Sequence, residues 1–381
     1  MGEELLRFVD EGYGVHLLRE MVRIPSVVGE ERELAEFLEG ELQGLGFKTR
    51  LQWVEEGRPN VIALHRFSEG RTLMFNGHLD TVPVCEGWET DPFEPVEREG
   101  RLYGLGSCDM KGGIASILMA LKAIMDSGME LRGTLAFTGV VGEEAYSKGA
   151  RAILETELAK ADAAIIGEPY TEVIPLGISG KILYELIVKG RSAHGFRPEM
   201  GINAIEEAAK ILTSLDRLRL GTHPRFGRGN VCTLKIEGGY KRYSVVVPDR
   251  CRVEINRLIV PGESVETAVE DMRHLIGELG LRAEVEVRTK PPYYEPFEMS
   301  PEEPIVKVFT EAYEEVRGVK PRFHYSLSIT DANVFAGEGG IPTLHLGPGG
   351  GGAHQPNEFV HLEDLKPTSM IHALTAEKFL K

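Results

Sequence analysis

The order of strand-like and helix-like segments is the feature that most constrains how this chain can fold. Through the first half of the chain, short apolar runs typical of strands alternate with amphipathic runs typical of helices. The strand patterns lie near residues 60–67, 71–77, 132–139 and 161–166, and the helical patterns lie near 11–24, 29–45, 111–126 and 147–158. Strands that alternate with helices favour a mostly parallel sheet covered by helices on both faces. We therefore predict an α/β fold.

A different pattern begins after Pro175. It follows the order strand, helix, strand, strand, helix, strand, in the segments 181–190, 202–215, 230–239, 245–260, 264–280 and 281–288. This β-α-β-β-α-β order is that of a ferredoxin-like unit. We predict an inserted domain at residues 177–290, between a first part of the main domain at 1–176 and a second part at 291–381. The proline-rich stretch 291–296 is predicted to connect back to the main domain.

Charge and composition exclude several classes of partner. The 381 residues carry a formal net charge of −16, which argues against binding to nucleic acids or to anionic membranes. The longest apolar runs are too short to span a bilayer, and no apolar segment of a signal peptide follows the acidic N-terminus. The four cysteines lack CxxC spacing, as is typical of free thiols in a reducing compartment. We expect a cytoplasmic globular protein.

Side chains that can bind metal ions follow several of the predicted strands. They are His78, Asp80, Asp109, Glu143, Glu144, Glu168 and, in a glycine-rich loop near the C-terminus, His354. Ligands of open α/β sheets bind beyond the carboxyl ends of the strands. Each residue alone has a more ordinary explanation, such as a turn, a helix N-cap or a solvated loop. Together they offer the mixed nitrogen and oxygen donors that suit Zn²⁺, and also Co²⁺ or Mn²⁺, which predicts a hydrolytic site with two metal ions.

The adjacent carboxylates Glu143 and Glu144 repel each other, and both resist burial unless a cation lies beside them. One could bind the cation while the other acts as general base, and the sequence does not distinguish the two. Asp80 shares a strand face with His78 and is therefore placed to orient the imidazole ring. Gly104 and Gly106 suggest an alternative, a phosphate-binding loop, but the third glycine of that motif is missing.

Seven segments of the chain resemble the M20 family of metallopeptidases and amidohydrolases, which includes acetylornithine deacetylase, succinyl-diaminopimelate desuccinylase, aminoacylase and glutamate carboxypeptidase. They are GHLDTVP (77–83), GLGSCDMKGG (104–113), GEEAYSKGA (142–150), GEP (167–169), KGRSAHGFRPEMGINAI (189–205), VPDRC (247–251) and GGAHQPNEFV (351–360). These segments extend in order over nearly the whole chain. M28-type aminopeptidases share a similar ligand order. They are expected to have Asp-Asn-x-Ser-Gly where this chain has residues 109–113, and they lack the inserted domain.

The resemblance implies a zinc-peptidase-like catalytic domain that binds two Zn²⁺ ions, with an inserted domain that serves as lid and dimerisation surface. Asp109 would bridge the two ions. His78 and Glu168 would complete one site, and Glu144 and His354 would complete the other. The implied reaction is attack by a metal-activated water on the carbonyl of an amide.

The resemblance also implies roles for residues outside the metal set. Glu143 would be the general base. His194, in the insert, would stabilise the oxyanion, either in its own subunit or in the partner subunit of a homodimer. Arg257 would bind a substrate carboxylate. Two departures concern that carboxylate: Val245 stands where many members have Asn, and Asn256 stands where Asp is common.

These observations predict a hydrolase of amide bonds in N-acyl amino acids or short peptides. The main alternative is a dipeptidase or carboxypeptidase of the same family. A more remote alternative is a non-catalytic module that binds metal ions or a metabolite on the same fold. The sequence does not name the acyl group or the side chain of the substrate.

Overall fold

The computed structural model describes residues 2–242 and 244–381. The chain forms two compact units. Unit 1 comprises Met1–Leu176, Met299–His324 and Thr330–Lys381, and unit 2 comprises Gly177–Glu298 and Tyr325–Ile329. Unit 2 is thus inserted into the sequence of unit 1.

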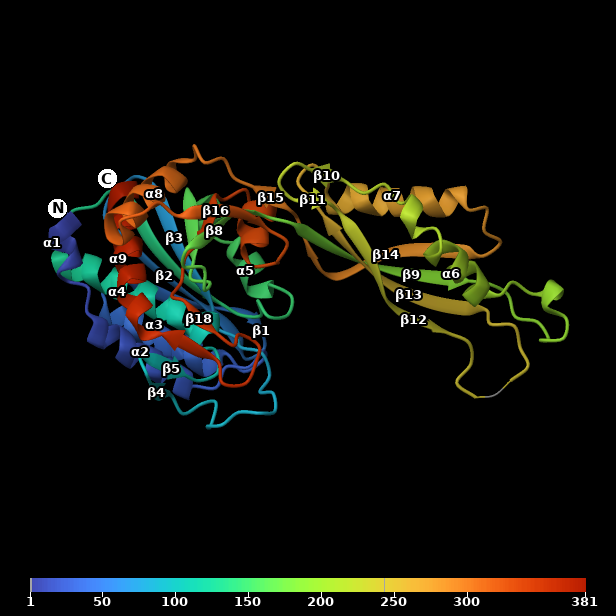
Figure 1. The fold of residues 1–381 in the computed structure, drawn as a ribbon, viewed down its shortest axis with the longest axis horizontal. Helices are drawn as coiled ribbons and strands as arrows, with labels where there is room; N and C mark the ends of the chain where they lie inside the picture. Colours follow the sequence, from blue (N-terminus) through green and yellow to red (C-terminus); the bar gives the residue numbers. More distant parts are fainter. Residues whose placement is uncertain (1, 243) are drawn as a thin grey trace. The chain divides into compact units, whose positions relative to one another are not determined.

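A six-stranded sheet forms the centre of unit 1 (Figure 1). Its strands, in spatial order, are β1 (Lys48–Glu55), β2 (Arg58–Arg66), β6 (Thr134–Val140), β3 (Thr72–His78), β7 (Ala163–Ile166) and β17 (Thr343–His345). The four strands from β6 to β17 are parallel, which confirms the prediction for that part of the sheet. β1 and β2 add an antiparallel edge. The sequence pattern does not predict β1 because its side chains are exposed or half-buried and form no apolar run.

Unit 1 also contains helices, some of which pack against this sheet and others against those helices. They are α1 (Gly2–Leu6), α2 (Glu11–Arg23), α3 (Arg32–Gly44), α4 (Gly112–Ser127), α5 (Lys148–Ile153), α8 (Pro304–Arg317) and α9 (Leu362–Phe379). α3 packs against β1 and β2, and α4 packs against β3, α2 and α9. Most side chains of α4 are buried, as its apolar character on all sides predicts. The buried start of α4 lies next to the loop that carries Asp109.

Unit 2 is built on a four-stranded antiparallel sheet of order β12-β13-β9-β14. Its elements along the chain are β9 (Gly180–Lys189), α6 (Ala204–Leu212), β12 (Asn230–Gly238), β13 (Arg250–Ile259), α7 (Val265–Glu278) and β14 (Glu284–Tyr294). Both the element order and the antiparallel sheet match the predicted ferredoxin-like unit. Alternate side chains of β9 and β13 point into a core that also contains the buried side chains of α6 and α7.

The structure corrects the predicted connector at residues 291–296. β14 continues through Tyr294, which pairs with Lys181 after a register shift that begins at Lys290. Pro291 and Pro292 lie within that shift. Because β14 is an edge strand, the missing N–H groups of the prolines leave no neighbouring strand without a partner.

Shorter elements complete the described chain. A second sheet in unit 1 has the order β18 (Gly350–Gly351), β19 (Phe359–His361), β5 (Arg101–Tyr103) and β4 (Val96–Arg98). A third sheet contains β15 (Phe297–Glu298), β8 (Val173–Ile178) and β16 (Arg322–Ser326), and a small hairpin contains β10 (Thr222–His223) and β11 (Gly227–Arg228). Asn333–Glu338 form a short helical turn. Within residues 2–242 and 244–381, no helix is long and apolar enough to cross a membrane.

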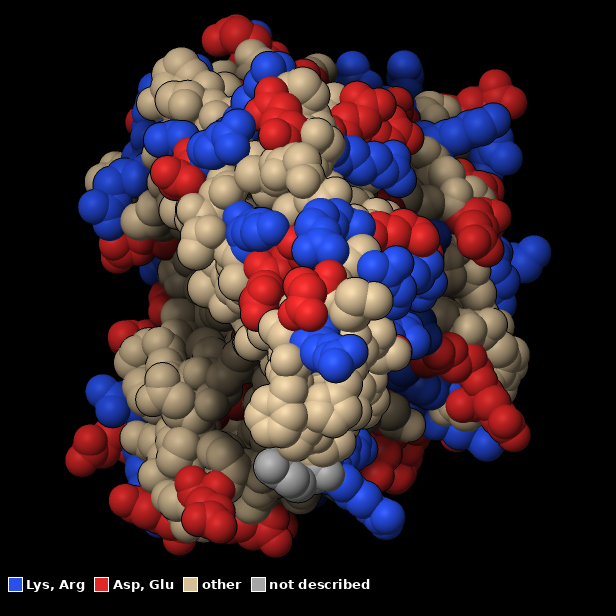
Figure 2. Space-filling view, turned by 90° about the vertical axis from the view of Figure 1, so that its right-hand side faces the viewer, with Lys and Arg blue, Asp and Glu red and all other residues tan. Residues whose placement is uncertain are grey.

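Charged side chains of both signs are mixed over the face shown in Figure 2, where neither sign forms a continuous surface. Ion pairs on the strands of unit 2 follow the same pattern. Arg252 lies 2.6 Å from Glu185 on the neighbouring strand, and Lys290 lies 3.0 Å from Glu254. The first pair joins the neighbouring strands β13 and β9 and favours their pairing, whereas the second reaches across β9 from β14 to β13.

Candidate metal centre

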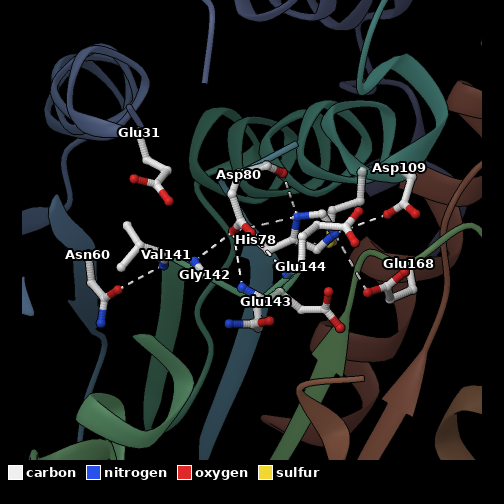
Figure 3. A network of polar contacts seen from close by, with 12 residues as sticks. Glu31, Asn60, His78, Asp80, Asp109, Val141, Gly142, Glu143, Glu144 and Glu168 are labelled. Carbon is white, nitrogen blue, oxygen red and sulfur yellow. Dashed lines mark hydrogen bonds and ion pairs between the residues drawn. The ribbon is translucent and has the colours of Figure 1, made fainter. Parts of the chain in front are cut away.

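The carboxyl ends of three neighbouring parallel strands bring the predicted ligands together in unit 1. His78 is the last residue of β3. Glu143 and Glu144 follow β6, and Glu168 follows β7. Asp109 lies in a short helical turn, Ser107–Lys111, immediately before α4. Figure 3 shows contacts from the His78 ring to Asp109 and Glu168.

Asp109 lies between two imidazole rings. Its Oδ1 atom is 3.0 Å from Nε2 of His78, and its Oδ2 atom is 3.3 Å from Nε2 of His354. Glu168 lies 3.8 Å from the first of these nitrogens, and Glu144 lies 2.8 Å from the second. The result is two triads that share the Asp109 carboxylate: His78, Asp109 and Glu168, and Asp109, Glu144 and His354, each with its ligand atoms within 4.8 Å of one another.

Glu143 also approaches this cluster. A third group of possible ligands contains His78, Glu143 and Glu144, with atoms within the same 4.8 Å. Only Glu144, however, has a direct contact with His354. The geometry therefore separates the two neighbouring carboxylates, since Glu144 joins the triad of His354 and Glu143 does not.

The His78 ring is held by the backbone of Asp80. Nδ1 of His78 lies 2.9 Å from the carbonyl oxygen of Asp80, so that Nδ1 donates and Nε2 is left to accept a cation. The Asp80 carboxylate was expected to make this contact, but it lies 4.0 Å from Nδ1. It instead accepts the N–H groups of Gly142, Glu143 and Glu144 at 2.8, 3.2 and 2.9 Å. Asp80, which follows β3, thus holds in place the loop that carries both Glu143 and Glu144 (Figure 3).

Burial and mutual repulsion shift the acid–base equilibria of this cluster. Burial, followed by the charge of Asp109, raises the pKa of Glu168 to about 8. Burial likewise raises the pKa of Glu143 and of Glu144. Hydrogen bonding to Asp109 raises the pKa of His354 to about 9. Burial opposes ionisation of Asp109, but contacts with His354 and His78 hold its pKa below the usual range.

These shifts test whether the residues fit metal ions. Several carboxylates packed together away from water resist simultaneous ionisation unless cations balance their charge. Two imidazoles and three carboxylates form the donor set around Asp109, which is a set that divalent zinc, cobalt or manganese accepts. The donor chemistry therefore fits two divalent cations that share one carboxylate.

Two further buried carboxylates were missed by the sequence analysis. Asp331 is 1% exposed; burial raises its pKa to about 6, and its charge raises the pKa of Glu143 and Glu168. Glu358 is also 1% exposed and binds the backbone of Asp109. Glu358 lies in the segment GGAHQPNEFV, only four residues after His354, and that proximity was the available signal.

His194 lies in unit 2, on an exposed loop, whereas the triads lie in unit 1. The backbone of His194 pairs with that of Val246 through an isolated β-bridge. The backbone N–H of Phe196 donates to Nδ1 of His194 at 3.2 Å. A neutral ring whose Nδ1 accepts a hydrogen bond carries its proton on Nε2. His194 can therefore present an N–H donor from its outer nitrogen.

The structure corrects the role predicted for Arg257. Its side chain is completely buried in unit 2, where the guanidinium lies 2.5 Å from Glu263 and 3.1 Å from Asp271. It also donates to the Tyr184 hydroxyl and to the carbonyl oxygen of Arg219. In this structure the guanidinium is enclosed by protein partners and does not face a substrate, so Arg257 belongs to the core of unit 2.

Known proteins resemble this chain in sequence and in fold. A family model described as "Peptidase family M20/M25/M40" matches residues 74–378. The chain belongs to the M20 peptidase family. It is accordingly a hydrolase of amide bonds in a metal-dependent family, as the sequence predicted.

Relatives of this M20 chain have different substrates in their names. It is 26% identical over 370 residues to a succinyl-diaminopimelate desuccinylase from a Nitratiruptor species, covering 94% of this chain and 97% of that protein. It is 29% identical to an N-formyl-4-amino-5-aminomethyl-2-methylpyrimidine deformylase from Bacillus subtilis, covering 86% and 85%. The structure of aminopeptidase PepT from Bacillus cereus superposes with a TM-score of 0.80 at 26% identity, covering 98% and 100%. The similarities therefore include both deacylases and peptidases.

Proposed function

We propose that this M20 hydrolase uses two Zn²⁺ ions to cleave the amide bond of an N-acyl amino acid or a short peptide. The observation that carries the proposal is the position of Asp109, whose two carboxylate oxygens face two different imidazoles. A carboxylate in that position can serve two cations at once. Co²⁺ and Mn²⁺ accept the same donors.

His78, Asp109 and Glu168 would hold one ion, and Asp109, Glu144 and His354 would hold the other. When bound, such ions polarise the substrate carbonyl and lower the pKa of water. The side chains of His78, Glu144 and Glu168 are largely buried, which strengthens the charge interactions among them, whereas His354 is half exposed.

Glu143 would be the general base. Its backbone is fixed by Asp80, and burial raises its pKa, so that its carboxylate can take a proton from water and hold it. It would then pass the proton to the nitrogen of the leaving amine. His194 would donate a hydrogen bond from its Nε2–H group to the developing oxyanion, from its own subunit or from the partner subunit of a homodimer.

Deacylase activity is the leading form of the proposal because full-length similarity to a desuccinylase covers almost the entire chain. A dipeptidase or carboxypeptidase remains the alternative, and the similarity to an aminopeptidase structure favours a peptide substrate as the second candidate. Acetylated and succinylated amino acids should be compared with di- and tripeptides. We also propose a cytoplasmic location, since the four cysteines are free thiols.

The central test is metal content. Protein reconstituted with Zn²⁺ should contain two ions per chain by elemental analysis and should hydrolyse at least one substrate of the panel. Asp109→Ala should lose both ions, because each triad contains this carboxylate. Fewer than one tightly bound ion per wild-type chain after zinc addition would contradict the proposal.

A further inference from the structure

The buried carboxylate of Glu358 is bound entirely to the backbone of the Asp109 loop. Its Oε2 atom accepts the N–H of Gly106 at 2.8 Å. Its Oε1 atom accepts the N–H groups of Cys108 and Asp109, both at 2.9 Å. Successive N–H groups that converge in this way form a concave site for an anion. Glu358 fills that site with a side chain of the protein itself.

The shape of the loop depends on Gly106. Its φ of +74° lies in the left-handed region, and a Cβ at this position would come within 2.5 Å of the Thr81 side chain. This turn lets the N–H groups of Gly106, Cys108 and Asp109 converge on the Glu358 carboxylate, while the N–H of Ser107 donates to the carbonyl oxygen of Gly104. The loop therefore needs both a glycine at its bend and an acceptor at its centre.

The chain around Glu358 is attached to the same region by further backbone contacts. The N–H of Gly104 donates to the carbonyl oxygen of Glu358 at 3.0 Å. Just beyond, β19 pairs with β5. Buried Lys111, in the same loop, donates to the carbonyl oxygens of Met21 and Ile24. The Glu358 segment and the Asp109 loop are therefore joined at several backbone positions.

The same segment carries His354, four residues before Glu358. Nε2 of His354 lies 3.3 Å from Oδ2 of Asp109, and both residues belong to the triad of Asp109, Glu144 and His354. One side chain thus joins the loop of the shared carboxylate to the loop of a histidine. A shift between these loops would change the position of Asp109 relative to both imidazoles.

We propose that Glu358 is a positioning residue of the metal centre. It holds the Asp109 backbone in a fixed position relative to His354, so that each carboxylate oxygen of Asp109 serves one ion. The inference rests on the proposed two-metal function. Asp80 has an equivalent arrangement, since its carboxylate accepts three N–H groups of the loop that carries Glu144. Each loop that supplies a carboxylate to the triad of His354 is therefore fixed by a buried carboxylate from another segment.

The test is a metal titration of Glu358→Gln. Glutamine offers one acceptor oxygen and turns an NH₂ donor toward the loop, so that at least one N–H group loses its partner. Chelator-stripped protein should be titrated with Zn²⁺ by calorimetry and with Co²⁺ by visible absorption. We expect about 10- to 100-fold weaker binding and an altered Co²⁺ spectrum, with unchanged far-ultraviolet circular dichroism. Glu358→Asp keeps the charge but is one methylene shorter, and its affinity for the metal ions should lie between that of the wild type and that of Glu358→Gln.

Glu207 provides a matched control in unit 2. It is also buried, and its Oε2 atom accepts the N–H groups of Arg282 and Ala283 at 2.6 and 3.3 Å, far in sequence from any metal ligand. Glu207→Gln should lower the melting temperature but bind Zn²⁺ and Co²⁺ like the wild type.

The possible outcomes separate this inference from the proposed function. Wild-type protein that binds no ions would contradict the two-metal function itself. If the wild type binds two ions and Glu358→Gln binds them with the same affinity and the same Co²⁺ spectrum, only the positioning role is wrong. The role is also wrong if Glu207→Gln weakens binding equally, or if neither Glu358 variant folds even with Zn²⁺ present, because Glu358 would then support the fold in general.

Discussion

Nε2 of His354 lies 2.8 Å from Oε1 of Glu144, although 210 positions separate the two residues in the chain. The contact closes the second triad. His354 is half exposed, and its backbone φ of +62° lies in the left-handed region. Its raised pKa means that the ring holds a proton in the acidic cluster when no other cation is present. A divalent ion and this proton therefore compete for the same place.

That competition predicts how pH affects the metal-free protein. The pKa of Glu168 is about 8 in the folded chain and about 4.3 when unfolded, so between these values the folded state keeps a proton that the unfolded chain has released. The free energy of unfolding should then fall as pH rises from about 5 to 8. The raised pKa of His354, about 9, acts in the same direction between about pH 6.5 and 9.

The measurement is the melting temperature of chelated protein at pH 6 and pH 8.5, compared with zinc-loaded protein. The chelated protein should lose stability at the higher pH, and the loaded protein should lose much less, because the ions replace the protons. An equal fall in both samples would mean that the cluster does not cause the effect.

A second prediction separates the two adjacent glutamates. Glu143→Gln keeps the size of the side chain but cannot accept a proton, so kcat should fall by at least ~10²-fold while metal content is preserved. Glu144→Gln should instead weaken metal binding, since Glu144 contacts His354 directly. Metal content and single-turnover rates measure the two effects. If Glu143→Gln loses metal and Glu144→Gln loses only rate, the two roles are exchanged.

The metal-site residues differ in how well the sequence predicts them, as a comparison of the proposed ligands with Glu358 shows. A polar residue after an apolar strand can be recognised because parallel strands end at one edge of a sheet, and this places His78, Glu144 and Glu168 together. Glu358 does not follow such a strand, and its partners are backbone N–H groups, which no residue type marks. Contacts that depend on loop conformation could not be read from the pattern.

Unit 2 gives a second contrast, between an element order and a side-chain role. The period-two side-chain pattern in the sequence predicts β9 and β13, because alternate residues of each strand face the core. Arg257 occupies a core-facing position of β13, where Glu263 and Asp271 enclose it. Charged residues are rarely buried completely, and the role that the family resemblance implied for Arg257 required an accessible side chain. Its partners come from a turn and a helix that the strand pattern does not locate.

A third prediction concerns Asp80. Asp80→Asn leaves one acceptor oxygen for the three N–H groups of residues 142–144. We expect kcat to fall about 10- to 100-fold through misplacement of the loop, with both ions retained. Measured metal content decides between the two roles. Loss of one ion from Asp80→Asn would show that fixing this loop positions the ligand Glu144 more than the base Glu143.

A fourth prediction concerns the homodimer and His194. β12 is an edge strand of unit 2, and its Leu234 and Ile236 are 59% and 48% exposed, which favours a two-fold pairing of this edge. Light scattering should give the mass of a dimer. His194→Ala and Glu143→Gln chains should each be nearly inactive. A mixture of the two should recover activity if His194 acts in the partner subunit; mixed dimers that bind metal but remain inactive would assign His194 to its own subunit.

The last prediction concerns Arg257, whose side chain is completely buried between Glu263 and Asp271. Arg257→Lys keeps one charge but loses the planar fork that reaches both carboxylates. The unfolding free energy should fall by about 1.5–3 kcal/mol, as for a lost hydrogen bond to a charged group. Lys189→Gln is the matched control, since it breaks exposed pairs with Glu284 and Glu286 and should lower the unfolding free energy much less.

Kinetics then decide between a structural and a substrate-binding arginine. A carboxylate substrate and its amide analogue should be compared in wild type and Arg257→Lys, at a temperature where both are folded. Because the guanidinium already donates to Glu263, Tyr184 and Arg219, we expect the ratio of kcat/KM for acid and amide to stay unchanged. A selective loss of the acid substrate would mean that the buried ion pairs open during catalysis and that Arg257 does reach the carboxylate. An unchanged ratio would leave substrate recognition to other side chains and would make Arg257 a stabiliser of unit 2 alone.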